Sequence, residues 1–226
     1  GFASGAGNSS MSNLINNSGV VGSDVTGVGS VRNATAGCEY GGDKGIFAHG
    51  STGNMSNLVS NVGVVSTDVD GVGTTRTQLG ACEYGTDKGI FGYGSTGSVS
   101  SLTNLISNSG VMASDTSGVG TARSNIRACS YGDDKGIFAY GDTGSDVSMS
   151  NLVNSSGVVA TDVTGVGTAR DQLAACEYGY DKGIFAYGHT SGLVSMSNLV
   201  SNAGVIATDV TGVGSARKDL AACSWG

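Results

Sequence analysis

Proline is absent from this chain of 226 residues, and charged side chains make up only 13% of it. No apolar run approaches the roughly 20 residues that a membrane-spanning helix needs. The formal net charge is −7, and negative charge disfavours binding to nucleic acid or to an anionic lipid surface. We therefore expect no nucleic acid and no membrane among the partners of this protein.

The short motifs of common catalytic and metal sites are also missing. No G-x-S-x-G, H-E-x-x-H or P-loop pattern occurs. The cysteines fit no zinc spacing such as C-x2-C, and histidine occurs only twice. These absences predict a protein that is not an enzyme and that has no metal site and no cofactor.

Glycine, in contrast, is abundant with 40 residues, but it shows no G-X-Y period and so does not indicate collagen. Valine, isoleucine and leucine are spread evenly along the chain, which is typical of a folded domain rather than of a disordered linker. The chain starts at Gly1 without an initiator methionine. We expect that a leader was removed or that the chain was excised from a precursor, although an expression scar would look the same.

The dominant feature of the sequence is a repeat of 44 to 47 residues. The segment "DKGIFAYG" occurs at 134–141 and 181–188, with near copies at 43–50 and 87–94. One cysteine marks each unit: Cys38, Cys82, Cys129, Cys176 and Cys223. The five units account for residues 1–226, which predicts a single domain.

Each unit contains four short segments that we interpret as strands. In the fourth unit these begin with "LAACEYG" (173–179) and "GIFAYG" (183–188), which flank a turn, and "MSNLVSN" (196–202) follows a variable Ser/Thr/Gly loop. The last strand resembles "GVVATDV" (157–163) of the preceding unit. Such runs between Gly, Asn and Asp predict strands and turns, and no segment has a helical apolar stripe.

Four strands in 40 to 50 residues are typical of a β-propeller blade. The sequence therefore predicts an all-β protein, a five-bladed β-propeller with four antiparallel strands per blade. A stacked β-solenoid is the alternative. The chain ends favour the propeller, because Phe2 aligns with Phe47 and Trp225 aligns with Tyr178. We expect the N- and C-terminal strands to pair and close the ring, which would hide exposed strand edges.

The order of Arg, small apolar residues, Tyr-Gly, "DK-IF-YG" and a later Asn-Leu resembles the Kelch repeat. This resemblance implies that "LAACEYG" is the innermost strand of its blade and that a C-terminal innermost strand closes the ring. The family's Gly-Gly doublet appears here as "YG" or "HG", the internal Trp is absent, and Kelch rings usually have six or seven blades. The chain also resembles uncharacterised tandem-repeat proteins of aquatic phages and microbes.

A residue that recurs in every unit is first a packing or turn element, because an enzyme needs one site rather than five. The motif D-x-x-G-x-G-x-x-R, as at Asp162 to Arg170, reads either as half of a calcium loop or as a connection between units in which Asp caps a turn and Arg pairs with a carboxylate. The cysteines read as small buried hydrophobes or as a ring of thiols that could bind a soft metal. The innermost strands supply three glutamates at one repeated position: Glu39, Glu83 and Glu177.

The candidate ligand-binding residues stand at the root of the variable loop or within it. They are His49, Tyr93, Tyr140, Tyr187, Asp142 and His189. Aromatic faces beside carboxylates suit sugar recognition, and similar blades would give multivalent binding. The alternative is that the tyrosines pack between blades. The two histidines belong to different units, so we expect them to lie far apart.

These features predict a non-enzymatic multivalent binding module, lectin-like or receptor-binding, on a virion or cell surface. Its expected partner is a carbohydrate or a glycosylated surface. The alternative is a structural subunit of a virion appendage or extracellular filament, with self-assembly through the outer strands. Both hypotheses place the protein outside the cell or on a virion.

Overall fold

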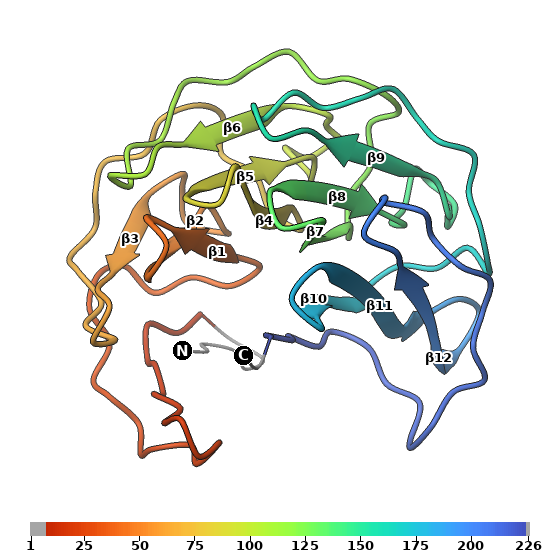
Figure 1. The fold of residues 1–226 in the computed structure, drawn as a ribbon. Helices are drawn as coiled ribbons and strands as arrows, with labels where there is room; N and C mark the ends of the chain where they lie inside the picture. Colours follow the sequence, from red (N-terminus) through yellow and green to blue (C-terminus); the bar gives the residue numbers. More distant parts are fainter. Residues whose placement is uncertain (1–7, 225–226) are drawn as a thin grey trace.

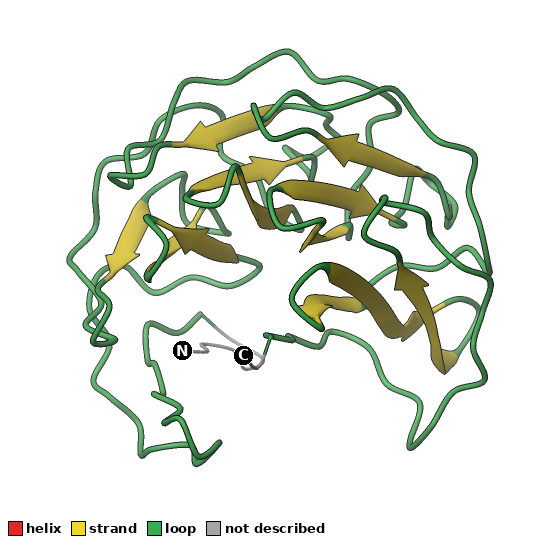
Figure 2. Ribbon diagram, viewed as in Figure 1, coloured by secondary structure: helices red, strands yellow, loops and turns green. Residues whose placement is uncertain are grey.

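The computed structural model describes residues 8–224, and this part of the chain contains twelve strands and no helix. The strands form four sheets of three antiparallel strands each (Figure 2). The all-β prediction is therefore confirmed. Because the described residues hold no helix, none of them forms a helix that could cross a membrane. The sheets are β1 (Ala36–Tyr40), β2 (Lys44–Ala48) and β3 (Ser56–Val59); β4 (Gly80–Tyr84), β5 (Lys88–Gly92) and β6 (Thr103–Ile106); β7 (Arg127–Tyr131), β8 (Lys135–Ala139) and β9 (Ser150–Val153); and β10 (Ala174–Tyr178), β11 (Lys182–His189) and β12 (Leu193–Val200).

The four sheets lie side by side along an arc, and β1, β4, β7 and β10 form its inner side (Figure 1). Neighbouring inner strands contact one another, β1 with β4, β4 with β7, and β7 with β10. Within each sheet the inner strand pairs with the middle strand, and the middle strand pairs with the outer one. Each sheet thus corresponds to one repeat of the sequence.

Cysteine and glycine bring adjacent sheets into close contact. A Cβ atom added at Gly136 of β8 would lie 2.5 Å from the Sγ of Cys82, which belongs to the preceding sheet. Gly183 stands in the same relation to Cys129, with 2.6 Å. Any larger residue at these glycines would push the sheets apart. Cys82 and Cys129 therefore act as small packing residues, and their free thiols are buried.

Our prediction of four strands per unit is wrong in one respect, because the outermost segment forms no regular strand. In the third unit it pairs with β9 only at two isolated bridges, Ser150 with Val163 and Val153 with Val159. Between these bridges the buried Asn151 side chain donates to the carbonyl of Ala160 at 3.0 Å. The segment therefore contacts β9 through isolated bridges and single hydrogen bonds rather than through a regular ladder.

The repeated Asp…Arg motif connects neighbouring units. The Arg123 guanidinium is fully buried, donates to Asn151 and lies 3.8 Å from Asp162 of the following unit. Asp162 also accepts hydrogen bonds from the backbone and the hydroxyl of Thr121, and from Asn151. The reading as a connection between units is therefore confirmed. Because donors of the protein surround this carboxylate, the calcium-loop alternative gains no support here.

A fifth unit is only partly represented among the described residues. Asn13 donates to Asp24 at 2.8 Å, which repeats the Asn–Asp pair of the other units. The described end segments, 8–35 and 201–224, contain isolated bridges or no pairing, and no regular strand. The residues expected to close the ring, Phe2 and Trp225, lie outside the described residues. Five-bladed closure is thus not part of the observed fold.

Candidate functional site

The repeated tyrosines of the variable loop are packing residues in the described structure. Tyr93 and Tyr140 have no exposed surface, and the Tyr93 hydroxyl donates to the carbonyl of Val119 at 3.0 Å. The Tyr93 ring lies between the Arg123 guanidinium, 4.5 Å away, and Phe138 of the next sheet, 5.2 Å away. Such a buried ring cannot contact a sugar, so the structure favours packing between units over ligand binding.

His49 takes the place of these tyrosines in the first unit and is equally buried. Neither ring nitrogen has a hydrogen-bond partner. Burial, followed by the nearby charge of Arg76, lowers the pKa of His49 to about 4. This residue is therefore a neutral core histidine with no access to a ligand.

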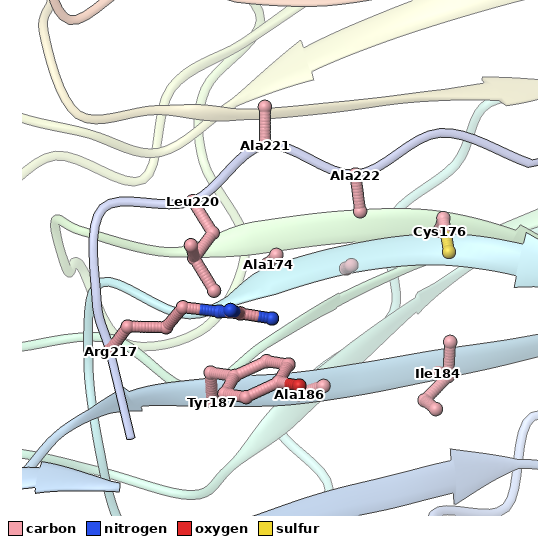
Figure 3. Close-up of a pocket in the computed structure, with 10 residues that line it drawn as sticks. Ala174, Cys176, Ile184, Ala186, Tyr187, Arg217, Leu220, Ala221 and Ala222 are labelled. Carbon is pink, nitrogen blue, oxygen red and sulfur yellow. The ribbon is translucent and has the colours of Figure 1, made fainter. Parts of the chain in front are cut away.

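Tyr187 is the exception among the tyrosines, because it borders a cavity of about 260 Å³ next to the C-terminal segment. In Figure 3 the Arg217 side chain lies over the Tyr187 ring, and Leu220, Ala221 and Ala222 approach from the C-terminal segment. The rest of the lining comes from β10 and β11 and is mostly apolar. At the corresponding place, Tyr140 packs against Phe185 of the next sheet. This cavity is therefore a packing position between units rather than a polar binding site.

A different region gathers the side chains that break the repeat. At the base of the variable loop, two residues form an isolated β-bridge. In the second unit these are Thr77 and Ser95, and at the equivalent positions of the fourth unit they are Asp171 and His189. Asp142 and Asp146 are paired in the adjacent loop of the third unit. Among residues 8–224, carboxylates and an imidazole thus form these bridges only at the junction between the third and fourth units.

Three carboxylates converge at this junction, and we call Asp142, Asp146 and Asp171 the aspartate cluster. One oxygen from each lies within 4.8 Å of the others. Asp171 is 7% exposed, and its Oδ2 accepts a hydrogen bond from Asn125 at 3.0 Å. Its Oδ1 is buried without a hydrogen-bond partner. The Nδ1 of His189 stands 3.7 Å from that oxygen, beyond hydrogen-bonding distance.

The electrostatics of the cluster follow from burial and crowding of like charge. Burial and then the charge of Asp146 raise the pKa of Asp171. Burial and then the charge of Asp142 raise the pKa of Asp146. Nearby, burial lowers the pKa of Arg127, and the charges of Asp219 and Asp171 oppose that change. The cluster is therefore a concentrated negative field that would favour a proton or a cation.

The structure brings together two of the predicted site residues, Asp142 and His189, and adds Asp146 and Asp171 to them. His49 and His189 follow or end the strands of different sheets, β2 and β11, so they do not form one site. The sequence does not single out Asp171 as a candidate. It directly follows Arg170, an arginine that recurs in every unit and is interpreted as part of the connection between units. Its signal in the sequence was the change from Asn, Thr and Ser in the earlier units to Asp.

The glutamates of the inner strands form a second, weaker acidic group. Burial and then the charges of Glu39 and Glu177 raise the pKa of Glu83 to about 7. These three side chains therefore influence one another across the inner side of the arc. No other observation in the described residues points to a ligand at this place.

Comparison with known proteins gives one informative result. No family model matches the chain, and the search of curated proteins likewise found no match. Among solved structures, the chain is similar to a fungal alcohol oxidase of the AA5 family in complex with copper, with a TM-score of 0.56 and 12% identity. The likeness covers 92% of this chain and 59% of the oxidase chain, so this chain spans less than two thirds of its neighbour.

This likeness contradicts our prediction of a non-enzymatic binding module, whether lectin-like, receptor-binding or structural. The solved protein described above is an oxidase by its title. The prediction erred because it treated repetition along the chain as evidence for repeated binding sites. At 12% identity the likeness establishes the fold only, and the resemblance to Kelch repeats stays a prediction.

The donors in this chain do not fit a copper ion. Copper favours imidazole and thiolate ligands, whereas His49 and His189 lie in different sheets. Burial raises the pKa of the Cys82 thiol to about 12 and that of Cys129 well above its ordinary value, so both stay protonated. The aspartate cluster is the one group of three candidate ligands among residues 8–224, and it offers oxygen atoms.

Proposed function

We propose that this chain is a five-bladed β-propeller with one catalytic centre, formed by the aspartate cluster and His189. The support for five blades is the fivefold repeat, the four neighbouring sheets and the partial fifth unit described above. The likeness to an oxidase supports an enzyme scaffold. The observation that carries the proposal is that three aspartates and one histidine that depart from the repeat lie together at the junction between the third and fourth units.

The reaction class that suits these groups is hydrolysis. Carboxylates and imidazole transfer protons and stabilise charge, and they are not electron carriers. In the proposed step His189 accepts a proton from a water molecule while the water oxygen attacks the scissile bond. The proton then passes to the leaving group, so that the bond broken in the substrate is replaced by bonds to the elements of water. His189 is 36% exposed at its side chain, which gives substrate and water access to it.

Carbohydrate remains the partner class that we propose, now as a substrate, and an extracellular or virion-surface location remains a proposal as well. In inverting glycoside hydrolysis a general base activates a water molecule that attacks the sugar, which is the role proposed for His189. Asp142 and Asp146 are partly exposed on the short loop that they bracket. Glycosides therefore come first among the substrates to be tested.

The test is a panel of chromogenic aryl glycosides, aryl esters and aryl phosphates, measured with the full chain and with His189→Gln. We expect turnover of at least one class and a loss of about 100-fold or more in His189→Gln, because general-base catalysis contributes factors of this order. Asp70→Asn, at an exposed carboxylate in the connection between the first and second units, is the matched control and should leave the rate unchanged. Turnover that survives in His189→Gln, or no turnover by a folded protein, would contradict the proposal.

A further inference from the structure

We propose that the aspartate cluster binds one hard divalent cation of the size of calcium. This inference rests on the proposed function for the role of the site, and it names the cofactor of that centre. It departs from our expectation, drawn from the sequence, that the protein has no metal. The donors are one carboxylate oxygen each from Asp142, Asp146 and Asp171.

The first argument is the orphaned oxygen of Asp171. The side chain is nine-tenths buried, and its Oδ1 has no hydrogen-bond partner although its Oδ2 is bound by Asn125. A buried acceptor without a partner costs on the order of 1–3 kcal/mol, and more when it is charged. One oxygen of Asp171 lies within 4.8 Å of an oxygen of Asp142 and of an oxygen of Asp146. A cation at their centre would satisfy it.

The second argument is charge. Three carboxylates with oxygens within 4.8 Å of one another repel one another when they are ionised. The cationic groups nearby do not neutralise it: Arg127 donates to the carbonyl of Ile126, and the His189 ring stands 3.7 Å from Asp171. A divalent cation would turn this repulsion into attraction.

The third argument is the chemistry and spacing of the donors. Carboxylate oxygens are the ligands of hard cations such as Ca²⁺, Mg²⁺ and Mn²⁺. Oxygens bound to calcium at about 2.3–2.6 Å can lie up to about 5 Å apart, whereas those bound to magnesium at about 2.0–2.1 Å lie at most about 4.2 Å apart. The three oxygens lie within 4.8 Å of one another, inside the range that calcium coordination allows, and the flexible geometry of calcium accepts this partly exposed site more readily than the strict octahedron of magnesium does.

The repeated aspartates provide an internal contrast. Asp209, like Asp162, is held by the backbone and hydroxyl of the preceding unit's threonine, Thr168, and by Asn198. Its hydrogen-bonding capacity is used by the protein itself. Asp171 differs because its second oxygen is left without a donor. The cation site is therefore expected once per chain rather than once per unit.

The remaining coordination positions would be open to solvent. Asp142 and Asp146 are partly exposed, and the backbone of Gly144 donates to Asp142 at 2.6 Å, which fixes the loop between them. Three protein ligands leave positions for water or for oxygen atoms of a substrate. A bound cation would place such a water molecule close to His189, the base of the proposed reaction.

The experiment is isothermal titration of the metal-stripped full chain with calcium chloride, and separately with magnesium chloride. We expect one calcium site per chain, with weaker binding of magnesium. Asp146→Asn should weaken calcium binding by about tenfold or more, because affinity follows the number of charged ligands. Asp171→Asn should act in the same direction. Asp70→Asn, which removes the same charge from an exposed position, should bind calcium like the unchanged protein.

Several outcomes would overturn the proposal. These are the absence of saturable calcium binding, more than one equivalent site, or unchanged binding in Asp146→Asn. Because Asp146 is partly exposed, that variant is expected to fold even if Asp171→Asn does not, and circular dichroism checks both. Calcium binding without turnover of any substrate would refute the proposed enzyme and leave this site intact. Turnover without calcium binding would refute the calcium site and leave the proposed enzyme intact.

Discussion

His49 shows how one residue can fit its neighbours and still lack its polar contacts. It stacks at 6.0 Å from Phe91, as Tyr93 and Tyr140 stack on their phenylalanines. The tyrosines, however, reach a valine carbonyl with their hydroxyl groups, and the shorter imidazole has no partner. The burial of His49 therefore costs free energy in two ways. The ring nitrogens make no hydrogen bonds, and the ring is kept from binding a proton below its ordinary pKa.

We predict that His49→Tyr stabilises the protein, and increasingly so at low pH. The pKa of His49 is about 4 in the folded chain and about 6.5 when unfolded, so below pH 6.5 the unfolded state binds the proton first and stability falls as pH decreases towards 4. We expect a gain of about 1 kcal/mol at pH 7.5 from the new hydrogen bond, and roughly 2 kcal/mol more at pH 5. Urea denaturation across this range measures both.

The difference between the variant and the unchanged protein isolates His49, because every carboxylate titrates in both. Tyr93→His is the reciprocal control: it removes the bond to Val119 and should make stability fall more steeply below pH 6.5. A His49→Tyr protein with no advantage at pH 7.5 and a parallel pH profile would show that His49 has partners in solution.

At the scale of the elements, the sequence predicts the inner hairpins well. Runs such as "LAACEY" and "KGIFAY" correspond to β10 and β11, because alternating packing and a glycine-containing turn determine a local hairpin. The fourth strand could not be excluded from the sequence. Its residues have high strand propensity, and the buried Asn151 side chain beside it is held by contacts with Arg123 and Ala160. Such long-range contacts leave no local pattern.

We predict that Asn151→Ala lowers the free energy of unfolding by about 2–4 kcal/mol. The change removes the acceptor of the buried Arg123 guanidinium and the donor to Ala160 and Asp162, and a buried charge that loses a partner is costly. Asn108→Ala is the control, because its contact with Asp87 is exposed, and it should cost less than about 0.5 kcal/mol. Equal effects of the two changes in urea denaturation would refute a structural role for the buried asparagine.

At the scale of the whole molecule, the repeat predicts that similar sheets follow one another along the chain. It does not predict the aspartate cluster, because the residues of that cluster depart from the repeat. Residues that recur in several units, such as Tyr93 and Tyr140, are packing residues. The candidates that lie at the aspartate cluster, Asp142 and His189, are those that depart from the repeat. Asp171 joins them only through the junction between two sheets, a spatial relation that the order of residues along the chain does not reveal.

Ring closure yields the last prediction, which concerns Phe2. If the chain ends complete a fifth blade, Phe2 occupies the position next to Tyr187 that Phe185 occupies next to Tyr140, at the apolar cavity between β11 and the C-terminal segment. Phe2→Ala should then lower the free energy of unfolding by about 3–5 kcal/mol, as for other buried phenylalanines. Val213→Ala, at a side chain that is 81% exposed, should change it by less than about 0.5 kcal/mol. A neutral Phe2→Ala in urea denaturation would mean that the ring stays open at this junction.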